Sequence, residues 1–245
     1  MTPLVRLRLE KAASDCGFDL TPRMVDDGSL ELRSAAFPEA LWIRQRAAED
    51  DAFHLSASSR MMLDALGADS AQEVLGFEEL YTALQRASAV ARTMPNRVAE
   101  AFQQATKMLP RSTEVERIVV QRVGQDLFRG ALLDYWQGRC CVTGLSMPSL
   151  LRASHIKPWN LCGTDEERLD VFNGLLLAPH VDALFDGGWI SFSDSGAVLI
   201  SSALPAPART VLGVSADWKI GSTKPAHAPY LAFHRANEFR GSSPT

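Results

Sequence analysis

Four polar residues, His155, Asn173, Asp182 and Asp186, lie within a stretch of 32 positions. A neutral histidine can take a proton from water, and paired carboxylates suit a hard divalent cation. Cleavage of a phosphodiester needs both functions, because a base must activate the water and a cation must offset charge on the phosphate and the leaving oxygen. The spacing therefore predicts one compact site for metal-dependent phosphodiester hydrolysis.

The residues around this site predict two strands followed by a short helix. Strand-like sequences over 150–156 and 174–178 are separated by a polar loop over 163–170. A helix over 180–186 is expected to end at Gly187-Gly188. Asp182 and Asp186 would then lie one helical turn apart on the same face.

The whole chain predicts an α+β fold in two domains, residues 1–110 and 111–245. Pro110 to Thr113 is the expected boundary. Alternation and turn residues predict the elements of the first domain. These are a helix over 3–16, strands over 29–34, 40–45 and 52–57, and helices over 59–66, 71–91 and 95–109.

A long amphipathic helix is predicted from Thr113 to about Gly138. Thr113 and Glu116 have the spacing of a capping box, in which each side chain bonds the other residue's backbone N–H. The expected apolar face comprises Val119, Val123, Leu127, Leu132 and Tyr135. Further on, Asp194-Ser195-Gly196 predicts a hairpin between two apolar strands.

Several motifs, in order, closely resemble bacterial HNH endonucleases of the restriction-enzyme type. They are Arg122-Val-Gly-Gln-Asp-Leu-Phe-Arg129, Arg139-Cys-Cys-Val-Thr-Gly144, Ala153-Ser-His-Ile-Lys-Pro-Trp159, Asn173-Gly-Leu-Leu-Leu177 and His180-Val-Asp-Ala-Leu-Phe-Asp186. The resemblance runs from about Thr113 to the C-terminus. It implies a ββα-metal nuclease domain and leaves residues 1–110 unassigned.

The resemblance also implies a role for each site residue. His155 matches the general base, and Asn173 matches the asparagine that orients it, although Asn173-Gly174 also suits a simple turn. Asp182 matches the helix-borne metal ligand, with Asp186 as a second ligand or a structural residue. Two carboxylates favour Mg²⁺ or Mn²⁺.

One position departs from the family pattern. Many HNH nucleases carry Asp or His directly before the base, whereas this chain has Ser154, a poor ligand for Mg²⁺. Either Asp182 and Asp186 hold the ion together, or His180 contributes, or substrate phosphate completes the coordination. His180 could instead face the phosphate as a proton donor.

Nucleic-acid contacts are expected from basic and polar residues near the base. Residues 107–160 contain eight Lys or Arg and four Asp or Glu, so this stretch carries +4 in a chain of net charge −4. Each side chain could equally be a solvated surface residue. The candidates are Arg122, Gln125, Arg129, Arg152 and Lys157.

The cysteines and the apolar runs exclude other classes. Cys16, Cys140, Cys141 and Cys162 form no paired knuckles, so reduced thiols are expected and no structural zinc. No apolar run reaches the roughly 18 residues of a membrane span, and the N-terminus lacks a secretory signal. A cytoplasmic location is the expectation.

The leading hypothesis is a DNA endonuclease that cuts double-stranded DNA, in restriction of foreign or modified DNA. The alternative is a catalytically weak or inactive HNH scaffold that binds DNA or protein, and Ser154 favours it. A nuclease acting on RNA would keep the chemistry and change the substrate. Cutting both strands needs two passes or two sites, so a homodimer is one expected assembly. The first domain would select the DNA target or support dimerisation.

Overall fold

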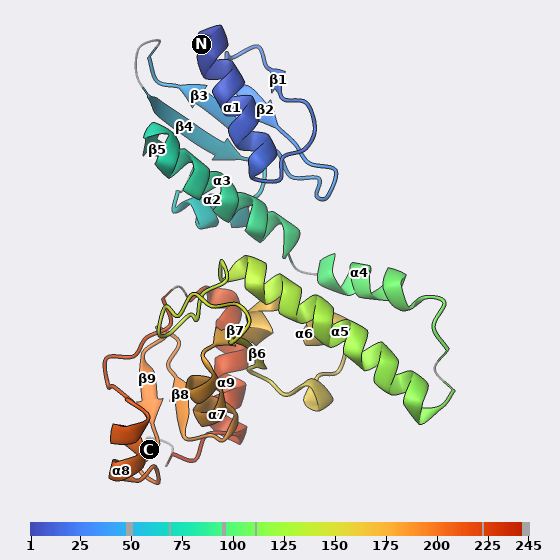
Figure 1. Cartoon of the computed structure of the whole chain (residues 1–245), viewed down its shortest axis with the longest axis vertical. Helices are drawn as coiled ribbons and strands as arrows, with labels where there is room; N and C mark the ends of the chain where they lie inside the picture. The colour runs from blue at the N-terminus through green and yellow to red at the C-terminus, as the bar shows by residue number, and fades with distance from the viewer. Residues whose placement is uncertain (48–50, 69, 95–96, 111, 222, 242–245) are drawn as a thin grey trace. The chain divides into compact units, whose positions relative to one another are not determined.

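The chain divides into two compact units, Met1–Met94 and Pro95–Thr245. The computed structural model describes residues 1–47, 51–68, 70–94, 97–110, 112–221 and 223–241 (Figure 1). Both units mix helices and strands, which confirms the predicted α+β class. The division falls after Met94, whereas the sequence placed the boundary at Pro110, so helix α4 lies within the second unit.

The first unit is an antiparallel sheet with helices on one face. The strands follow chain order in the sheet, and Figure 1 shows α1 and α3 lying across the same side of it. The elements are α1 (Pro3–Asp15), β1 (Arg23–Met24), β2 (Leu30–Leu32), β3 (Leu41–Gln45), β4 (Ala52–Ala57), α2 (Arg60–Leu66), β5 (Gln72–Leu75) and α3 (Gly76–Arg92).

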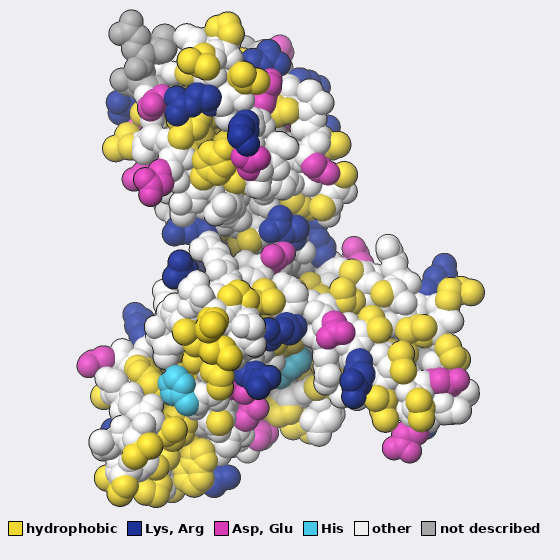
Figure 2. Space-filling view, in the orientation of Figure 1, with side chains coloured by type: hydrophobic (Ala, Val, Ile, Leu, Met, Phe, Trp, Pro, Cys, Tyr) yellow, Lys and Arg dark blue, Asp and Glu magenta, His cyan; other side chains and the backbone are white. Residues whose placement is uncertain are grey.

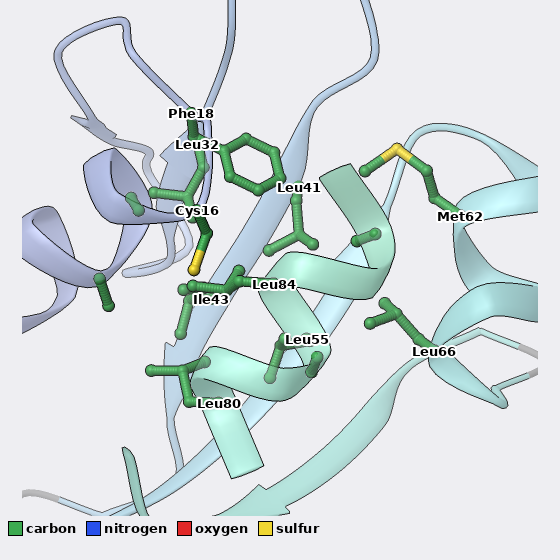
Figure 3. Close-up of a cluster of buried hydrophobic side chains, with 14 of the residues drawn as sticks. Cys16, Phe18, Leu32, Leu41, Ile43, Leu55, Met62, Leu66, Leu80 and Leu84 are labelled. Atoms are coloured by element: carbon green, nitrogen blue, oxygen red, sulfur yellow. The ribbon is translucent and has the colours of Figure 1, made fainter. Parts of the chain in front are cut away.

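Strand alternation places the core of this unit between the sheet and its helices. Leu41 and Ile43 are fully buried, while Arg44 on the other face is exposed. Figure 3 shows the inward side chains meeting Leu80 and Leu84 of α3. Apolar burial of this kind is the main stabilising term for a unit of this size.

One predicted helix of the first unit begins too early. Residues 72–75 form strand β5, and α3 starts only at Gly76. Val74 is buried opposite Phe53 of β4 in this strand. Gly76 has φ +81°, a left-handed conformation that glycine adopts readily and that separates strand from helix.

The second unit contains a long helix, a small ββα motif and a C-terminal hairpin with helices. Its elements are α4 (Arg97–Thr106), α5 (Glu114–Tyr135), β6 (Arg152–His155), η1 (Trp159–Leu161), α6 (Asp165–Leu169), η2 (Val171–Asn173), β7 (Gly174–Leu177), α7 (Pro179–Asp186), β8 (Ile190–Phe192), β9 (Val198–Ile200), α8 (Ala206–Val211), η3 (Pro225–His227) and α9 (Ala228–Asn237). Figure 1 shows α5 running beside β6 and β7.

Helix α5 begins with the predicted capping box, but its buried face matches the predicted one only in part. Thr113 Oγ1 accepts from Glu116 N, and Glu116 Oε2 accepts from Thr113 N. The buried residues are Val120, Gly124, Phe128, Ala131 and Leu132. The predicted face was therefore correct at Leu132 and wrong at Val119, which is exposed. Helix α5 carries apolar residues on two sides, and tertiary packing selects between them.

Strands β6 and β7 pair antiparallel, with His155 opposite Gly174. Helix α7 follows directly and ends at a turn that only glycine fits. Gly188 has φ +68°, and a Cβ there would lie 2.1 Å from the backbone oxygen of Glu238. This close approach joins the end of α7 to the last helix.

None of the helices in the described ranges is both long and apolar enough to cross a membrane.

Candidate active site

The ββα motif, α5 and α9 enclose a cleft of about 600 Å³. It brings together His155 from the end of β6 with Asp182 and Asp186 from α7, as the spacing predicted. Its lining also includes Gln125, Asp126, Phe128, Arg129, Arg152, Ala153, Ser154, Ile156, Pro158, His234 and Glu238.

The His155 ring is fixed in one tautomer. Its Nε2 lies 2.8 Å from the main-chain oxygen of Arg168. Because a carbonyl oxygen can only accept, Nε2 must carry the hydrogen and Nδ1 must keep its lone pair. Nδ1 has no hydrogen-bond partner within the described ranges, so it is the nitrogen that can take a proton.

Two aromatic rings surround the imidazole. Phe128 of α5 stacks on it, with ring centroids 3.9 Å apart and 17° between the planes, and Trp159 meets it edge-on at 5.5 Å. Burial among these rings lowers the pKa of His155, although the bond to the Arg168 carbonyl opposes the shift. The imidazole is therefore neutral at physiological pH and able to act as a base.

Glycines make room for both rings. A Cβ on Gly174 would lie 2.6 Å from the Phe128 ring, and a Cβ on Gly124 would lie 2.6 Å from Trp159. Gly174 has φ −142°, which any residue can adopt, so the steric need is the absence of a side chain and not an unusual backbone. The Asn173-Gly174 dipeptide thus serves packing as well as the start of β7.

Asn173 is fully buried and binds the loop that follows β6. Its Oδ1 accepts from Lys157 N at 2.7 Å, and its Nδ2 donates to the main-chain oxygens of Lys157 and Glu167 at 3.2 and 3.1 Å. None of these bonds reaches the His155 ring. Asn173 instead fixes the loop at Glu167. The residue after Glu167 is Arg168, whose carbonyl orients the His155 ring.

Charged side chains brace the same loop internally. Lys157 Nζ lies 2.5 Å from Glu167 Oε1, and Arg168 donates to the main-chain oxygens of Trp159 and Cys162. Lys157 was predicted to bind nucleic acid, but this ion pair holds it away from the cleft lining. The sequence could not distinguish the two roles because its partner, Glu167, lies ten positions further along the chain.

The two aspartates of α7 form a carboxylate pair at the cleft. Burial and the nearby Asp186 carboxylate raise the pKa of Asp182, while Ser154 and the Arg152 charge oppose the shift. Asp186 is exposed as a residue, yet partial loss of hydration in the cleft raises the pKa of its carboxyl group as well. Ser154 Oγ donates to Asp186 Oδ1 at 3.0 Å. Raised pKa values mark two negative charges that the protein alone does not fully compensate.

The segment that carries this geometry matches a known family. Residues 140–193 match the family model described as HNH endonuclease. These residues form an HNH endonuclease domain. The match contains β6, β7 and α7, and therefore His155, Asn173, Asp182 and Asp186. No curated protein matched the chain.

The carboxylates of the HNH domain fit a divalent metal ion, as is general for HNH nucleases. Carboxylate oxygens are hard ligands, the kind that a hard divalent cation prefers. Among the residues that the structure describes, no three His, Cys, Asp or Glu side chains converge as a complete metal site. An ion held by Asp182 and Asp186 would thus keep positions open for water and for phosphate oxygens.

His180, the third expected ligand, lies outside the cleft lining of the HNH domain. Its ring packs against Trp218 with centroids 5.9 Å apart. The structure therefore does not bring His180 to the carboxylate pair. It is the second residue of α7, two residues before Asp182, and this offset points the two side chains in different directions around the helix.

Of the expected nucleic-acid contacts, Gln125, Arg129 and Arg152 line the cleft and Arg122 does not. Arg129 donates to the main-chain oxygens of Leu151 and Pro148, so part of its guanidinium holds the entry to β6. Arg152 is exposed and forms no ion pair within the described ranges. Arg152 therefore brings an unpaired positive charge to the cleft lining.

The sequence missed a histidine that supports α7, the helix that carries Asp182 and Asp186. His234 of α9 is buried, stacks on Phe185 at 3.8 Å and contacts the main-chain oxygen of Phe185 through Nε2 at 3.2 Å. Its Nδ1 lies 2.9 Å from Ser191 Oγ. Phe185 precedes Asp186, so α9 fixes the end of α7. His234 falls within the stretch, from about Thr113 to the C-terminus, that resembles the family, and this was the available signal.

Proposed function

We propose that this protein is a metal-dependent DNA endonuclease. The observation that carries the proposal is the cleft shared by His155, held in one tautomer, and the Asp182–Asp186 pair. The HNH domain implies DNA as the substrate. A role in restriction of foreign or modified DNA rests on the resemblance to restriction-type HNH nucleases.

In the proposed reaction, His155 Nδ1 accepts a proton from the attacking water. The oxygen of that water forms a new bond to phosphorus, and the bond from phosphorus to O3′ breaks. This gives a 5′-phosphate and, after O3′ gains a proton, a 3′-hydroxyl. The Arg168 carbonyl oxygen accepts the hydrogen bond from His155 Nε2–H throughout, and this bond stabilises the imidazolium that forms.

Asp182 and Asp186 would hold the divalent ion, which when bound supplies positive charge beside the phosphate and the leaving oxygen. Ser154 orients the Asp186 carboxylate by its hydrogen bond. Arg152 adds a second positive charge at the cleft and can bind a neighbouring phosphate, as arginine does in many DNA complexes.

Calorimetric titration of Mn²⁺ together with plasmid cleavage tests the assignment of the carboxylates. Asp182→Asn should weaken Mn²⁺ binding at least tenfold and reduce cleavage by two or more orders of magnitude. The matched control is Asp217→Asn, an exposed aspartate outside the cleft, which should leave both unchanged. Equal Mn²⁺ affinity and cleavage in wild type and Asp182→Asn would refute the role of Asp182.

A second function, a binding module on an HNH scaffold, is favoured by one observation. Ser154 replaces a common metal ligand and is bonded to Asp186. This function predicts DNA binding without Mn²⁺ binding and without cleavage by the wild type. The same titration, repeated with DNA present, separates the two functions.

A further inference from the structure

The first half of α5 carries an apolar surface that none of the described residues of its own unit covers. Val115 is 71% exposed, and Ile118 and Val119 are each 45% exposed. Figure 2 shows hydrophobic side chains gathered over this part of α5. The capping box at Thr113 keeps these residues helical. Contiguous exposed apolar side chains on an ordered helix are typical of an interaction surface.

This surface lies opposite the face that α5 buries. Successive helical residues are about 100° apart, so Val115, Ile118, Val119 and Arg122 fall within an arc of roughly 100°. The buried residues, from Val120 to Leu132, centre on the other side of the helix. Helix α4 also packs on the buried side, since Phe102 approaches Gly124. The exposed arc therefore remains available for another molecule.

The charged residues beside the arc have opposite signs at its two ends, so they can pair between two copies of the helix. Glu114 and Arg122 lie four residues before and four residues after Ile118. Both are exposed, and neither forms an ion pair within the described ranges. Eight residues span about 12 Å along a helix, so the two cannot pair within one chain. In an antiparallel pair of α5 helices centred on Ile118, Glu114 of each copy faces Arg122 of the other.

We propose that the chain forms a homodimer through residues 114–122 of α5, with the two helices antiparallel about a two-fold axis. The Val115, Ile118 and Val119 side chains form the apolar centre of this interface, and two Glu114–Arg122 ion pairs flank it. A two-fold axis makes the same patch complementary to itself. Each copy brings its own catalytic cleft, so the dimer holds two.

The interface is small, so the dimer is expected to be weak. Stable interfaces bury roughly 1,200–2,000 Å² in total, more than three turns of one helix pair can supply. The dissociation constant should therefore lie in the micromolar range. Sedimentation velocity from about 1 to 200 µM should show the mass rise from one copy towards two. A sedimentation mass of one copy at every concentration would overturn the proposal. That result is also expected if another protein or another part of the chain covers the arc.

Val119→Glu places charge in the centre of the interface and should weaken dimerisation at least tenfold. Val211→Glu is the matched control, because Val211 is an 84% exposed valine on a different helix, α8. Circular dichroism of each variant verifies that the helices persist. Equal dimerisation of Val119→Glu and wild type would exclude this interface.

A charge-reversal cycle tests the antiparallel register. Glu114→Arg and Arg122→Glu should each weaken the dimer, because like charges then face each other, and the double variant should restore it. Failure of the double variant to recover dimerisation would contradict the antiparallel arrangement. These measurements need neither DNA nor cleavage, so they are independent of the proposed nuclease activity.

Discussion

The chemistry of His155 depends on groups that supply no side-chain hydrogen bond to it. A main-chain carbonyl fixes its tautomer, and the stacked Phe128 ring removes water from one face. Burial of the ring favours the neutral imidazole, whereas the bond to the carbonyl opposes that shift but leaves Nδ1 as the nitrogen that is free to accept a proton. A general base works best when it is unprotonated at the operating pH, and burial provides that here.

Gly174→Ala tests the stacking of Phe128 on His155. The added methyl group would lie 2.6 Å from Phe128 and 2.7 Å from Leu132, so Phe128 must shift from the imidazole. We expect a loss of about 1–3 kcal/mol in the free energy of unfolding and at least a tenfold slower cleavage. Urea denaturation and single-turnover cleavage measure the two effects.

Gly130→Ala is the control, since a Cβ at Gly130 meets no atom within 4 Å. It lies within α5, where alanine is the better helix former, so it should raise stability by up to about 1 kcal/mol. Undiminished cleavage in Gly174→Ala would show that Phe128 does not position the base.

At the scale of elements, the loop between β6 and β7 connects Asn173 with His155. The Asn173 amide binds the backbone of this loop at Lys157 and Glu167, and the loop presents the Arg168 carbonyl to the imidazole. Asparagine suits this position because it offers one acceptor and two donors in a buried space. Asn173 is therefore proposed as a positioning residue that does not contact the substrate.

Asn173→Ala should destabilise the second unit by about 3 kcal/mol, because it leaves a buried N–H and two carbonyls without their partner. Cleavage should fall at least a hundredfold. Nitrogen NMR of the His155 ring provides a readout that a purely structural role would not change. Wild type should show only the Nε2–H tautomer, and the variant a mixture. A ring signal identical in both would disprove the link between loop and base.

The sequence predicted those elements and residues that short-range patterns specify. Alternating residues predicted β7, and the glycine turn predicted the end of α7. Pairing of β7 with β6, with α7 following directly, brings His155 to the two aspartates. The buried face of α5 could not be predicted, because the helix is apolar on two sides and the choice depends on residues far along the chain. The contact of His155 with the Arg168 carbonyl could not be predicted either, because a main-chain oxygen is present at every residue and no side-chain type indicates it. The prediction that His180 joins the carboxylate pair was wrong, because residues two apart on a helix point in different directions.

At the scale of the whole molecule, the two units differ in charge. Residues 1–94 contain 10 Lys or Arg and 15 Asp or Glu, a formal charge of −5. Residues 95–245 contain 15 and 14, a formal charge of +1. Attraction of the second unit to DNA therefore depends on the placement of groups such as Arg152 and not on net charge.

Two buried histidines make the second unit sensitive to acid. Burial lowers the pKa of His227 and of His234 to about 4 in the folded state, against about 6.5 in an unfolded chain. The unfolded state therefore binds more protons between these values. Stability is complete above pH 6.5, falls as the pH drops from 6.5 to 4, and loses up to about 3 kcal/mol for each histidine.

Unfolding can be followed by tryptophan fluorescence, since four of the five tryptophans lie in the second unit. His227→Gln should reduce the acid loss by up to about 3 kcal/mol, because glutamine does not titrate and can still accept from Lys224 N. The same loss of stability between pH 6.5 and 4 in variant and wild type would show that His227 is not the titrating group.

Plasmid cleavage by His155→Ala, with Mg²⁺ or Mn²⁺ present, tests the proposed mechanism most directly. We predict that wild-type protein cuts the plasmid, and that the variant cuts it at least a hundredfold more slowly while it remains folded by circular dichroism and its DNA affinity stays close to that of wild type. Cutting by His155→Ala at the wild-type rate would contradict the assignment of His155 as the base.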